Sequence, residues 1–254
     1  MIHCLTEIRV TIIMKRNILK FILFFFLFGC LENDNNPKPI SNSINKIISL
    51  GASRVEGERP NFESYRYDLW KILVENNWTF DFIGTQSDRA NYPSYLGYDF
   101  DVDHEGRGGW TSGDILENIE QWLIETGSPD FVLLSSPGGN DALEDLPFLD
   151  AVSNINLIVD ILQDDNPNIT IIIEQLAPAH SEIMTAELTS FWQLMRQEVL
   201  KISENKTTNS SLVIPVDMFT GFNDNLLADD VHYNKLGAKF IANRYYNILK
   251  NLLE

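Results

Sequence analysis

Cysteine is scarce in this chain, which has only Cys4 and Cys30 among its 254 residues. Cys4 lies before the segment that we interpret below as an export signal, and Cys30 lies at its end, so residues 31–254 contain no cysteine. A disulfide framework and a thiolate metal site are therefore excluded for the body of the chain.

Basic residues are also in short supply. Lys and Arg number 19 against 36 Asp and Glu, which gives a formal net charge of −17. Residues 1–29 contain four of the basic residues and one of the acidic ones, so residues 30–254 carry 15 against 35, or −20. Such a surface repels phosphate backbones and other polyanions, so we expect no nucleic-acid partner and disfavour strongly sulfated glycans. Neutral acetylated sugars carry no such penalty.

A long hydrophobic run is missing as well. The longest mainly apolar stretch is the eleven residues from Ile18 to Phe28, which follow Lys15-Arg16 and precede Gly29-Cys30. This order is typical of a targeting segment, and Leu27-Phe28-Gly29-Cys30 resembles the lipobox of bacterial lipoproteins. Cleavage before Cys30 would leave a lipidated thiol as the membrane anchor. A single membrane-spanning anchor is the alternative, for which eleven residues are short.

These features divide the chain into three parts. Residues 1–29 are predicted to be the lipoprotein signal peptide, with Met14 as a possible true start because it directly precedes the basic pair. Residues 30–44, rich in Asn, Asp, Pro and Ser, are predicted to be a lipidated flexible tether. Residues 45–254 are predicted to form one catalytic domain. The expected location is the membrane of a bacterium, facing the periplasm or the cell surface.

Strand-like and helix-like segments alternate along residues 45–254, which predicts an α/β fold. The expected strands are 46–50, 80–83, 131–135, 169–174 and 212–216, and the expected helices are 62–77, 112–126, 151–162, 187–202 and 235–253. The pattern predicts a three-layer α/β/α sandwich with a mainly parallel, five-stranded sheet.

Three short segments, far apart in sequence, hold residue types suited to hydrolysis. They are Gly51-Ala52-Ser53, Gly139-Asn140-Asp141 and Asp229-Asp230-Val231-His232. The first two follow expected strands and the third precedes the last expected helix. Because the carboxyl ends of parallel strands share one crevice, we expect these segments to converge there.

A serine hydroxyl is a weak nucleophile until an imidazole takes its proton, and the imidazole needs a carboxylate to fix its tautomer. Ser53, His232 and Asp229 supply these three groups. Asp230 is a rival for the carboxylate, and an ordinary helix N-cap or turn is the alternative reading of Ser53 and of Asn140.

These segments resemble the SGNH (GDSL-like) hydrolases, a family named for four blocks that carry a Ser, a Gly, an Asn and a His. The run Asp103-His104-Glu105-Gly106-Arg107-Gly108-Gly109-Trp110-Thr111 resembles the second block of the carbohydrate esterase, or acetyl xylan esterase-like, branch. The resemblance implies a flavodoxin-like fold and an oxyanion hole formed by Ser53, Gly109 and Asn140. Two departures are Ala52, where the family usually has Asp, and Gly108, where it usually has Ser.

Further residues are weaker candidates. Trp110, Arg107 and His180 are predicted to lie on the substrate side, since the first two belong to the second block and His180 follows an expected strand. His104 and its acidic neighbours resemble a metal cluster, but alternating polar residues in a solvated loop are commoner, and we expect neither a metal nor a cofactor.

The combined expectation is a serine carboxylic ester hydrolase that removes O-acetyl groups from a carbohydrate, with an acetylated saccharide or another small ester as substrate. A lipolytic esterase of the lysophospholipase or thioesterase type is the alternative within enzymes. A non-catalytic glycan-binding lipoprotein is the alternative outside them, and the departures at Ala52 and Gly108 are what favour it.

Overall fold

A computed structural model describes residues 38–253 of the chain. The predicted signal peptide, Cys30 and most of the predicted tether lie outside these described residues. No helix within residues 38–253 is both long and apolar enough to cross a membrane.

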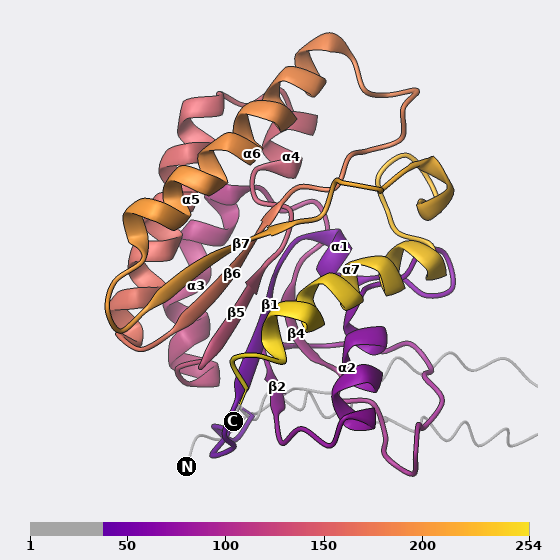
Figure 1. Ribbon diagram of the computed structural model, residues 1–254, viewed down its shortest axis with the longest axis vertical. Helices are drawn as coiled ribbons and strands as arrows, with labels where there is room; N and C mark the ends of the chain where they lie inside the picture. Colours follow the sequence, from indigo (N-terminus) through magenta and orange to yellow (C-terminus); the bar gives the residue numbers. More distant parts are fainter. Residues whose placement is uncertain (1–37, 254) are drawn as a thin grey trace, which may run out of the picture. The chain divides into compact units, whose positions relative to one another are not determined.

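A single, mainly parallel sheet forms the centre of the described domain (Figure 1). Its strands are β1 (Lys46–Gly51), β2 (Asp81–Ile83), β3 (Gln86–Ser87), β4 (Asp103–Gly106), β5 (Phe131–Leu134), β6 (Thr170–Gln175) and β7 (Leu212–Asp217). The order is β3-β4-β1-β5-β6-β7, and only the β3–β4 pair is antiparallel. One edge of β1 pairs with β5, while the other pairs first with β2 and then with β4. β4 and β5 therefore both end beside the carboxyl end of β1.

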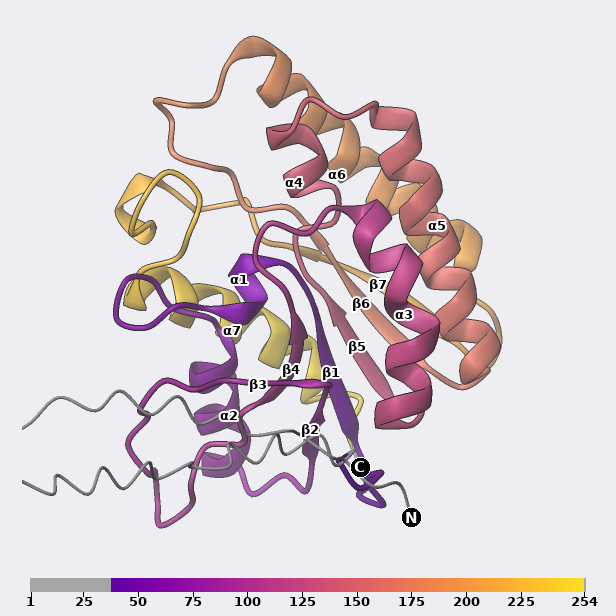
Figure 2. The same ribbon diagram turned by 180° about the vertical axis from the view of Figure 1, so that it is seen from behind.

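Helices cover both faces of this sheet. They are α1 (Ser53–Glu56), α2 (Arg66–Glu75), α3 (Ser112–Thr126), α4 (Gly139–Leu143), α5 (Phe148–Asp165), α6 (Ala186–Lys206) and α7 (Lys235–Leu249), with a 3₁₀ turn η1 (Asp224–Leu226) before α7. Figures 1 and 2 show α2 and α7 on one face and α3, α5 and α6 on the other. The arrangement is the predicted three-layer sandwich.

Strand β5 shows how the sequence creates two cores. Its four residues are all buried, and successive side chains point to opposite faces. Phe131 and Leu133 pack with residues of α2 and α7, whereas Val132 and Leu134 pack with residues of α3, α5 and α6. A continuous apolar run is what a strand buried on both faces requires.

Helix ends follow local chemistry. Thr111 caps α3 by accepting the Asp114 N–H, and the Asp114 side chain accepts the Thr111 N–H in return. Thr185 caps α6, and Asn234 caps α7 through the N–H groups of Leu236 and Gly237. Each cap satisfies donors that the first helical turn leaves open.

The sheet has two more strands than the five we expected. β3 and β4 fall between the strand expected at 80–83 and the helix expected at 112–126, where we expected no strand and placed His104 in a solvated loop. β4 consists of Asp103-His104-Glu105-Gly106, a sequence without strand propensity. It is nevertheless largely buried, because its polar side chains form hydrogen bonds inside the fold. Strand propensity does not take such partners into account.

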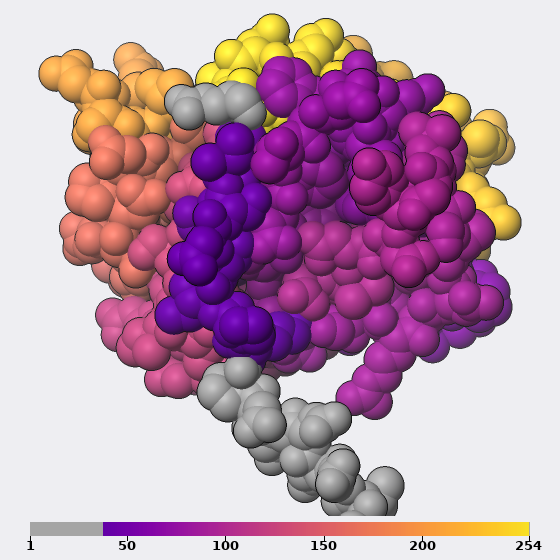
Figure 3. All heavy atoms as spheres, turned by 90° about the horizontal axis from the view of Figure 1, so that it is seen from below, coloured from indigo at the N-terminus to yellow at the C-terminus, as the bar shows by residue number. Residues whose placement is uncertain are grey.

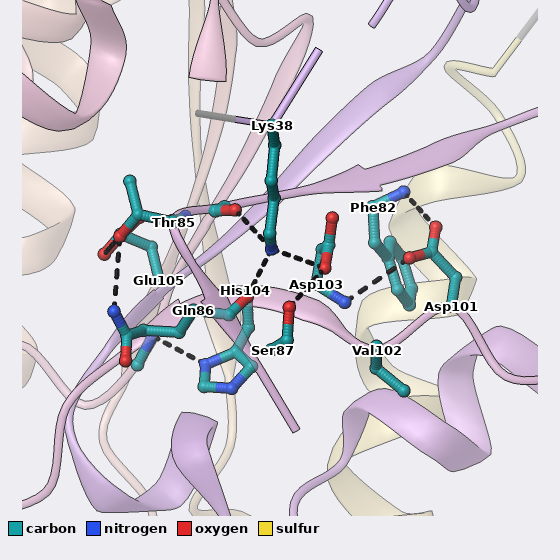
Figure 4. Close-up of polar contacts among 12 residues, drawn as sticks. Lys38, Phe82, Thr85, Gln86, Ser87, Asp101, Val102, Asp103, His104 and Glu105 are labelled. Atoms are coloured by element: carbon teal, nitrogen blue, oxygen red, sulfur yellow. Dashed lines mark hydrogen bonds and ion pairs between the residues drawn. The ribbon is translucent and has the colours of Figure 1, made fainter. Parts of the chain in front are cut away.

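Lys38 shows that contact with the sheet begins before residue 45, where we expected the domain to start. Figure 3 shows the first described residues, in indigo, lying along the surface. The Lys38 ammonium donates to the carbonyls of Gly84 and Gln86 at 3.1 and 3.0 Å, and to Asp103 at 2.6 Å (Figure 4). These three bonds hold the chain against the edge formed by β3 and β4.

His104 is buried in β4 and faces the domain interior. Its Nδ1 accepts the Gly106 N–H at 3.0 Å (Figure 4), which makes the neutral ring part of the local backbone structure. Burial, together with the positive charges of Arg66, Lys38 and Arg107, lowers the pKa of His104 to about 2. Burial raises the pKa of the nearby Asp101 to about 6. The hydrogen bond that the Asp101 carboxylate accepts from the Phe82 N–H favours the charged form and opposes part of this shift.

Replacing His104 by Asn keeps an acceptor for the Gly106 N–H and removes the titrating ring. The unfolded chain protonates histidine below pH ~6.5, whereas the folded protein holds His104 neutral, so the stability contributed by the neutral ring is complete above that pH and is lost as the pH falls. The quantity to compare is the free energy of unfolding of the wild type minus that of His104→Asn. We expect this difference to fall by about 1.4 kcal/mol for each unit of decreasing pH between about pH 6 and pH 4.

Urea unfolding of both proteins at several pH values measures this difference. Asp101 titrates in the same window in both proteins, so its contribution cancels in the comparison. A difference that stays constant with pH would contradict the assignment of a neutral, buried His104.

Candidate active site

Ser53 lies directly beyond the carboxyl end of β1 and begins α1. Gly51 permits this turn, because a Cβ there would lie 3.0 Å from the carbonyl oxygen of Ser135 and 2.8 Å from the Val55 side chain. Strand β5 can therefore approach β1 closely where both strands end. The serine is thereby fixed at the predicted edge of the sheet.

The structure brings the first and third predicted segments together. Oγ of Ser53 lies 2.8 Å from Nε2 of His232, and Nδ1 of His232 lies 2.7 Å from Oδ2 of Asp229. Ser53 and His232 are 179 positions apart in sequence. The three side chains form one continuous hydrogen-bonded chain, with the imidazole between the hydroxyl and the carboxylate.

Local backbone geometry fixes the orientation of Asp229. Its Oδ1 accepts the N–H groups of Val231 at 2.9 Å and of His232 at 2.7 Å, which leaves Oδ2 for the imidazole. Partial burial alone would raise the pKa of Asp229, but these hydrogen bonds outweigh it and hold the pKa below its ordinary value. The carboxylate is therefore charged at neutral pH. The exposed Asp230 contributes its backbone carbonyl to the His180 N–H at 2.7 Å.

Phe62 supports the imidazole from the side. Its ring stacks on His232 with a centroid distance of 3.8 Å and an interplanar angle of 13°. The next residue, Glu63, donates its N–H to the Tyr233 carbonyl at 2.8 Å, so both rings are held by paired backbone. Sequence reasoning missed Phe62, since an aromatic residue at the first position of a predicted helix, here 62–77, carries no catalytic signal.

The three residues expected to form an oxyanion hole line one cleft. Ser53 begins α1, and Gly109 lies in a turn. Neither of their backbone N–H groups donates a hydrogen bond to another group of the described residues. Gly109 has a φ of +79°, a left-handed conformation that favours glycine. Asn140 lies in the first turn of α4 and lines the same cleft as Ser53 and Gly109.

The second predicted segment is linked to the loop that carries Gly109. One N–H of the Asn140 side-chain amide donates to the Trp110 carbonyl at 2.8 Å. The amide has a second N–H, which takes no part in this bond. The buried Asp141 carboxylate accepts the Ser112 N–H at 2.9 Å and the Ser112 hydroxyl at 2.5 Å. Asn140 and Asp141 thus hold this loop on both sides of Thr111.

The departure at Gly108 has a structural reason. The Glu56 carboxylate accepts the Gly108 N–H at 2.5 Å, and a Cβ at position 108 would lie 2.6 Å from the same carboxylate oxygen. A serine there would compete with Glu56 for space. The second departure, Ala52, contributes an apolar wall to the pocket described next.

Two hollows meet at Ser53. An open cleft of about 430 Å³ is lined by Ser53, Gly109, Asn140 and His232, with Glu56, Glu58 and Phe62 along its side. A much smaller, mainly apolar pocket of about 40 Å³ shares Ser53, Asn140 and Val231 with the cleft. The lining of this pocket includes Ile115, Leu134, Ile155, Trp110 and Trp192.

The three weaker site candidates have different surroundings. Trp110 lines the apolar pocket, as expected for a substrate-side residue. Arg107 instead forms an ion pair with the buried Glu105 and lies over the Trp122 ring at 4.1 Å, and it is not among the residues lining either hollow. His180 also lies outside both linings, 3.8 Å from Asp224.

Metal binding finds no support in the part of the chain that the structure describes. Within it, no three or more His, Cys, Asp or Glu side chains group in a way that could hold a metal ion. The acids beside His104 have other partners, since Asp103 binds Lys38 and Glu105 accepts the Thr85 N–H.

Comparison with known proteins gives structural matches. No family model matches the sequence, and no curated protein sequence matches it. The structure of an acetyl esterase mutant with acetate ion has a TM-score of 0.70 at 25% identity over 82% of this chain and 98% of that one. A family 3 carbohydrate esterase from Clostridium thermocellum has a TM-score of 0.67 at 28% identity over 83% of this chain and 100% of that one.

A third solved structure agrees in fold. A family 3 carbohydrate esterase from Talaromyces cellulolyticus has a TM-score of 0.69 at 24% identity, over 82% of this chain and 98% of that one. The matches extend over most of the described domain and nearly the full length of each neighbour. By its fold and by these matches to esterases, the chain resembles the SGNH (GDSL-like) hydrolases, a family of carboxylic ester hydrolases.

Proposed function

We propose that this protein is a serine hydrolase that removes O-acetyl groups from carbohydrate. The observation that carries the proposal is the continuous chain of hydrogen bonds from Ser53 through His232 to Asp229. This series of hydrogen bonds ends at Ser53 in a cleft that is also lined by the residues expected to hold an oxyanion. Such an arrangement is the one that acyl transfer by a serine requires.

In the first step, Nε2 of His232 takes the proton of the Ser53 hydroxyl while Oγ attacks the ester carbonyl carbon. Asp229 holds the proton on Nδ1 and stabilises the imidazolium that forms. Phe62 restricts rotation of the imidazole, because its ring covers one face of it. The imidazole therefore presents Nε2 to Oγ without further rearrangement.

The carbonyl oxygen becomes negatively charged as the tetrahedral intermediate forms. The N–H groups of Ser53 and Gly109 and the second N–H of the Asn140 amide supply three donors for it. Donors fixed in advance lower the barrier because they need no reorganisation during the reaction. The bonds from Asn140 to the Trp110 carbonyl and from Ser112 to Asp141 fix the loops that carry these donors.

Collapse of this intermediate breaks the ester bond. His232 gives its proton to the departing sugar hydroxyl, and the acetyl group stays on Oγ of Ser53. A water molecule then takes the place of the alcohol, loses its proton to His232 and attacks the acyl-enzyme. The bond from the acyl carbon to Oγ breaks, His232 returns its proton to Oγ of Ser53, and acetic acid leaves and ionises in solution.

The small apolar pocket supports a short acyl group. A volume of about 40 Å³ has room for about three water-sized groups, which suits an acetyl group better than a fatty acyl chain. The open cleft of about 430 Å³ can receive a larger polar alcohol. The names of the structural neighbours, an acetyl esterase and family 3 carbohydrate esterases, agree with this division.

One observation favours a lipolytic esterase as a second candidate. A groove of about 390 Å³ between α4 and the beginning of α6 has polar and apolar lining in about equal measure, and its apolar part consists of Ala142, Leu143, Leu146, Ile183, Leu188 and Phe191. Leu143 lines both this groove and the small pocket, so displacement of its side chain could connect them.

The direct test is acetate release from a panel of acetylated polysaccharides by the protein and by its Ser53→Ala variant. We expect release by the wild type, and a loss of roughly 10⁴-fold or more in the variant, because it lacks the attacking oxygen. Acetate can be quantified by a coupled enzymatic assay or by NMR. Equal release by both proteins would refute Ser53 as the nucleophile, and no release by either would refute the proposed substrate class.

The two neighbouring acids provide a matched pair for the carboxylate role. Asp229→Asn should lower kcat by roughly 10³–10⁴-fold, because an amide cannot stabilise the imidazolium or enforce the correct tautomer. Asp230→Asn removes the same charge one position away and should retain most of the wild-type kcat, since of these two acids Asp229 is the one bonded to the imidazole. Steady-state kinetics on an acetyl ester measure both. An equal loss in the two variants would argue for a general charge effect instead.

Acyl-chain length separates the two candidate substrates. We expect kcat/KM of the wild type to fall by roughly 10–100-fold from the acetyl to the hexanoyl ester of p-nitrophenol, because overfilling a small pocket costs about 1–3 kcal/mol. Leu143→Ala should raise the hexanoyl rate relative to the acetyl rate by opening the pocket toward the groove between α4 and α6. A wild type that prefers hexanoyl or longer esters would instead support the lipolytic candidate.

A further inference from the structure

Arg54, the residue immediately after Ser53, lies at the meeting point of three loops that carry the site. It is only 7% exposed, and no motif in the sequence marks it. Its guanidinium donates to backbone or side-chain oxygens of the segment before His232, the segment after β6 and the segment after β5. One buried side chain therefore connects three segments that are distant in sequence.

The first connection reaches the segment that carries His232. Nε of Arg54 donates to the Val231 carbonyl at 2.8 Å, while the Val231 N–H donates to Asp229 at 2.9 Å. Val231 is therefore held at both of its backbone polar groups. The guanidinium also lies 4.8 Å from the centre of the Tyr233 ring, a favourable cation–π distance. Arg54 thus contacts both sequence neighbours of His232.

The second connection reaches the chain beyond β6. Nη1 of Arg54 donates to the Ala177 carbonyl and Nη2 to the Pro178 carbonyl, both at 3.0 Å. Two residues later, the His180 N–H donates to the Asp230 carbonyl at 2.7 Å. The segment beyond β6 is in this way bound to Arg54 and to the loop that carries His232.

The third connection reaches the segment that leads to Asn140. Nη1 of Arg54 lies 3.4 Å from Oγ of Ser136, and the fully buried Glu174 accepts the Ser136 N–H at 2.7 Å and its hydroxyl at 3.2 Å. Ser136 has a φ of +47°, which is unfavourable for a serine and needs support from its surroundings. Arg54 and Glu174 both supply that support through the Ser136 hydroxyl.

The shape of the guanidinium matters as much as its charge. Its five N–H groups lie in one plane and point in fixed directions, so it can serve several carbonyls at once. A lysine ammonium is a single point and cannot reach Val231, Ala177 and Pro178 together. Loss of Arg54 would leave these carbonyls without their donor and free the loop before His232 to move.

We propose that Arg54 is a positioning residue that holds His232 at hydrogen-bonding distance from Ser53, through the Val231, Ala177 and Pro178 carbonyls. It contacts no reacting atom. A shift of about 1 Å in a catalytic group can cost about 100-fold in rate, so this contact reaches the chemistry through geometry alone. The inference rests on the proposed serine mechanism.

The test compares Arg54→Lys and Arg54→Met with Arg196→Lys and Arg196→Met. Arg196 on α6 is a matched control, because its Nε donates to the Leu176 carbonyl at 2.9 Å, in the same segment beyond β6, while its side chain has no bond to the segments of Ser53 or His232 within the described domain. Two rates are measured: hydrolysis of an acetyl ester, and labelling of Ser53 by a fluorophosphonate, followed by intact mass. Far-UV circular dichroism confirms that each variant is folded.

Both Arg54 variants should show a kcat and a labelling rate lower by about 100-fold, with KM changed by less than about threefold. Millimolar guanidinium chloride should restore part of the activity of Arg54→Gly, whereas sodium chloride at the same ionic strength should not. Both Arg196 variants should behave like the wild type. Folded Arg54 variants with wild-type labelling rates, or an equal loss in Arg196→Met, would overturn the proposal.

The two readouts separate the inference from the proposed function. A wild type that is labelled by the fluorophosphonate but releases no acetate would refute the proposed substrate, while the labelling rates of the Arg54 variants would still decide the role of Arg54. If Arg54→Met fails to fold, Arg54→Lys and the rescue of Arg54→Gly decide it.

Discussion

Parallel hydrogen bonding of β1 to β5 on one edge, and to β2 and β4 on the other, is the constraint on which the site depends. It brings the ends of β1, β4 and β5 together, and with them the loops that begin at Ser53, Arg107 and Ser136. The loop before α7 is held beside them by the hydrogen bonds of Asp229 to its own backbone and by the bond from Arg54 to the Val231 carbonyl, which together place His232 next to Ser53. Residues from four distant parts of the sequence therefore meet without a long insertion or a second domain.

Much of the fold could be predicted from the sequence because apolar periodicity records which face of an element is buried. The helix expected at 112–126 has those bounds in the structure, and the five expected strands all form within one or two residues. β3 and β4 could not be predicted, since both strands depend on partners that are distant in sequence, such as Lys38 for Gln86 and Asp103 and Thr85 for Glu105. The lipid anchor at Cys30 stays a prediction.

The site shows the same limit. Short motifs identify Ser53, Asn140 and His232, because their chemistry demands particular residue types. The residues that fix these groups in place, Phe62 and Arg54, carry no such requirement and can be found only from their contacts. The same reasoning explains Arg107, whose position in the second block suggested contact with substrate but whose charge is neutralised by the buried Glu105.

The contact between Glu56 and Gly108 makes the residue types at two positions, 52 residues apart in sequence, depend on each other. The carboxylate occupies the space that a side chain at position 108 would need, so a change at either position alters what the other can tolerate. Because the atom in contact is the far end of a flexible side chain, a residue with a Cβ at position 108 requires the Glu56 carboxylate to move aside. For protein engineering, restoring the serine usual at position 108 exchanges the hydrogen bond from the Gly108 N–H to Glu56 for a new position of the Glu56 side chain, so positions 56 and 108 are best varied as a pair.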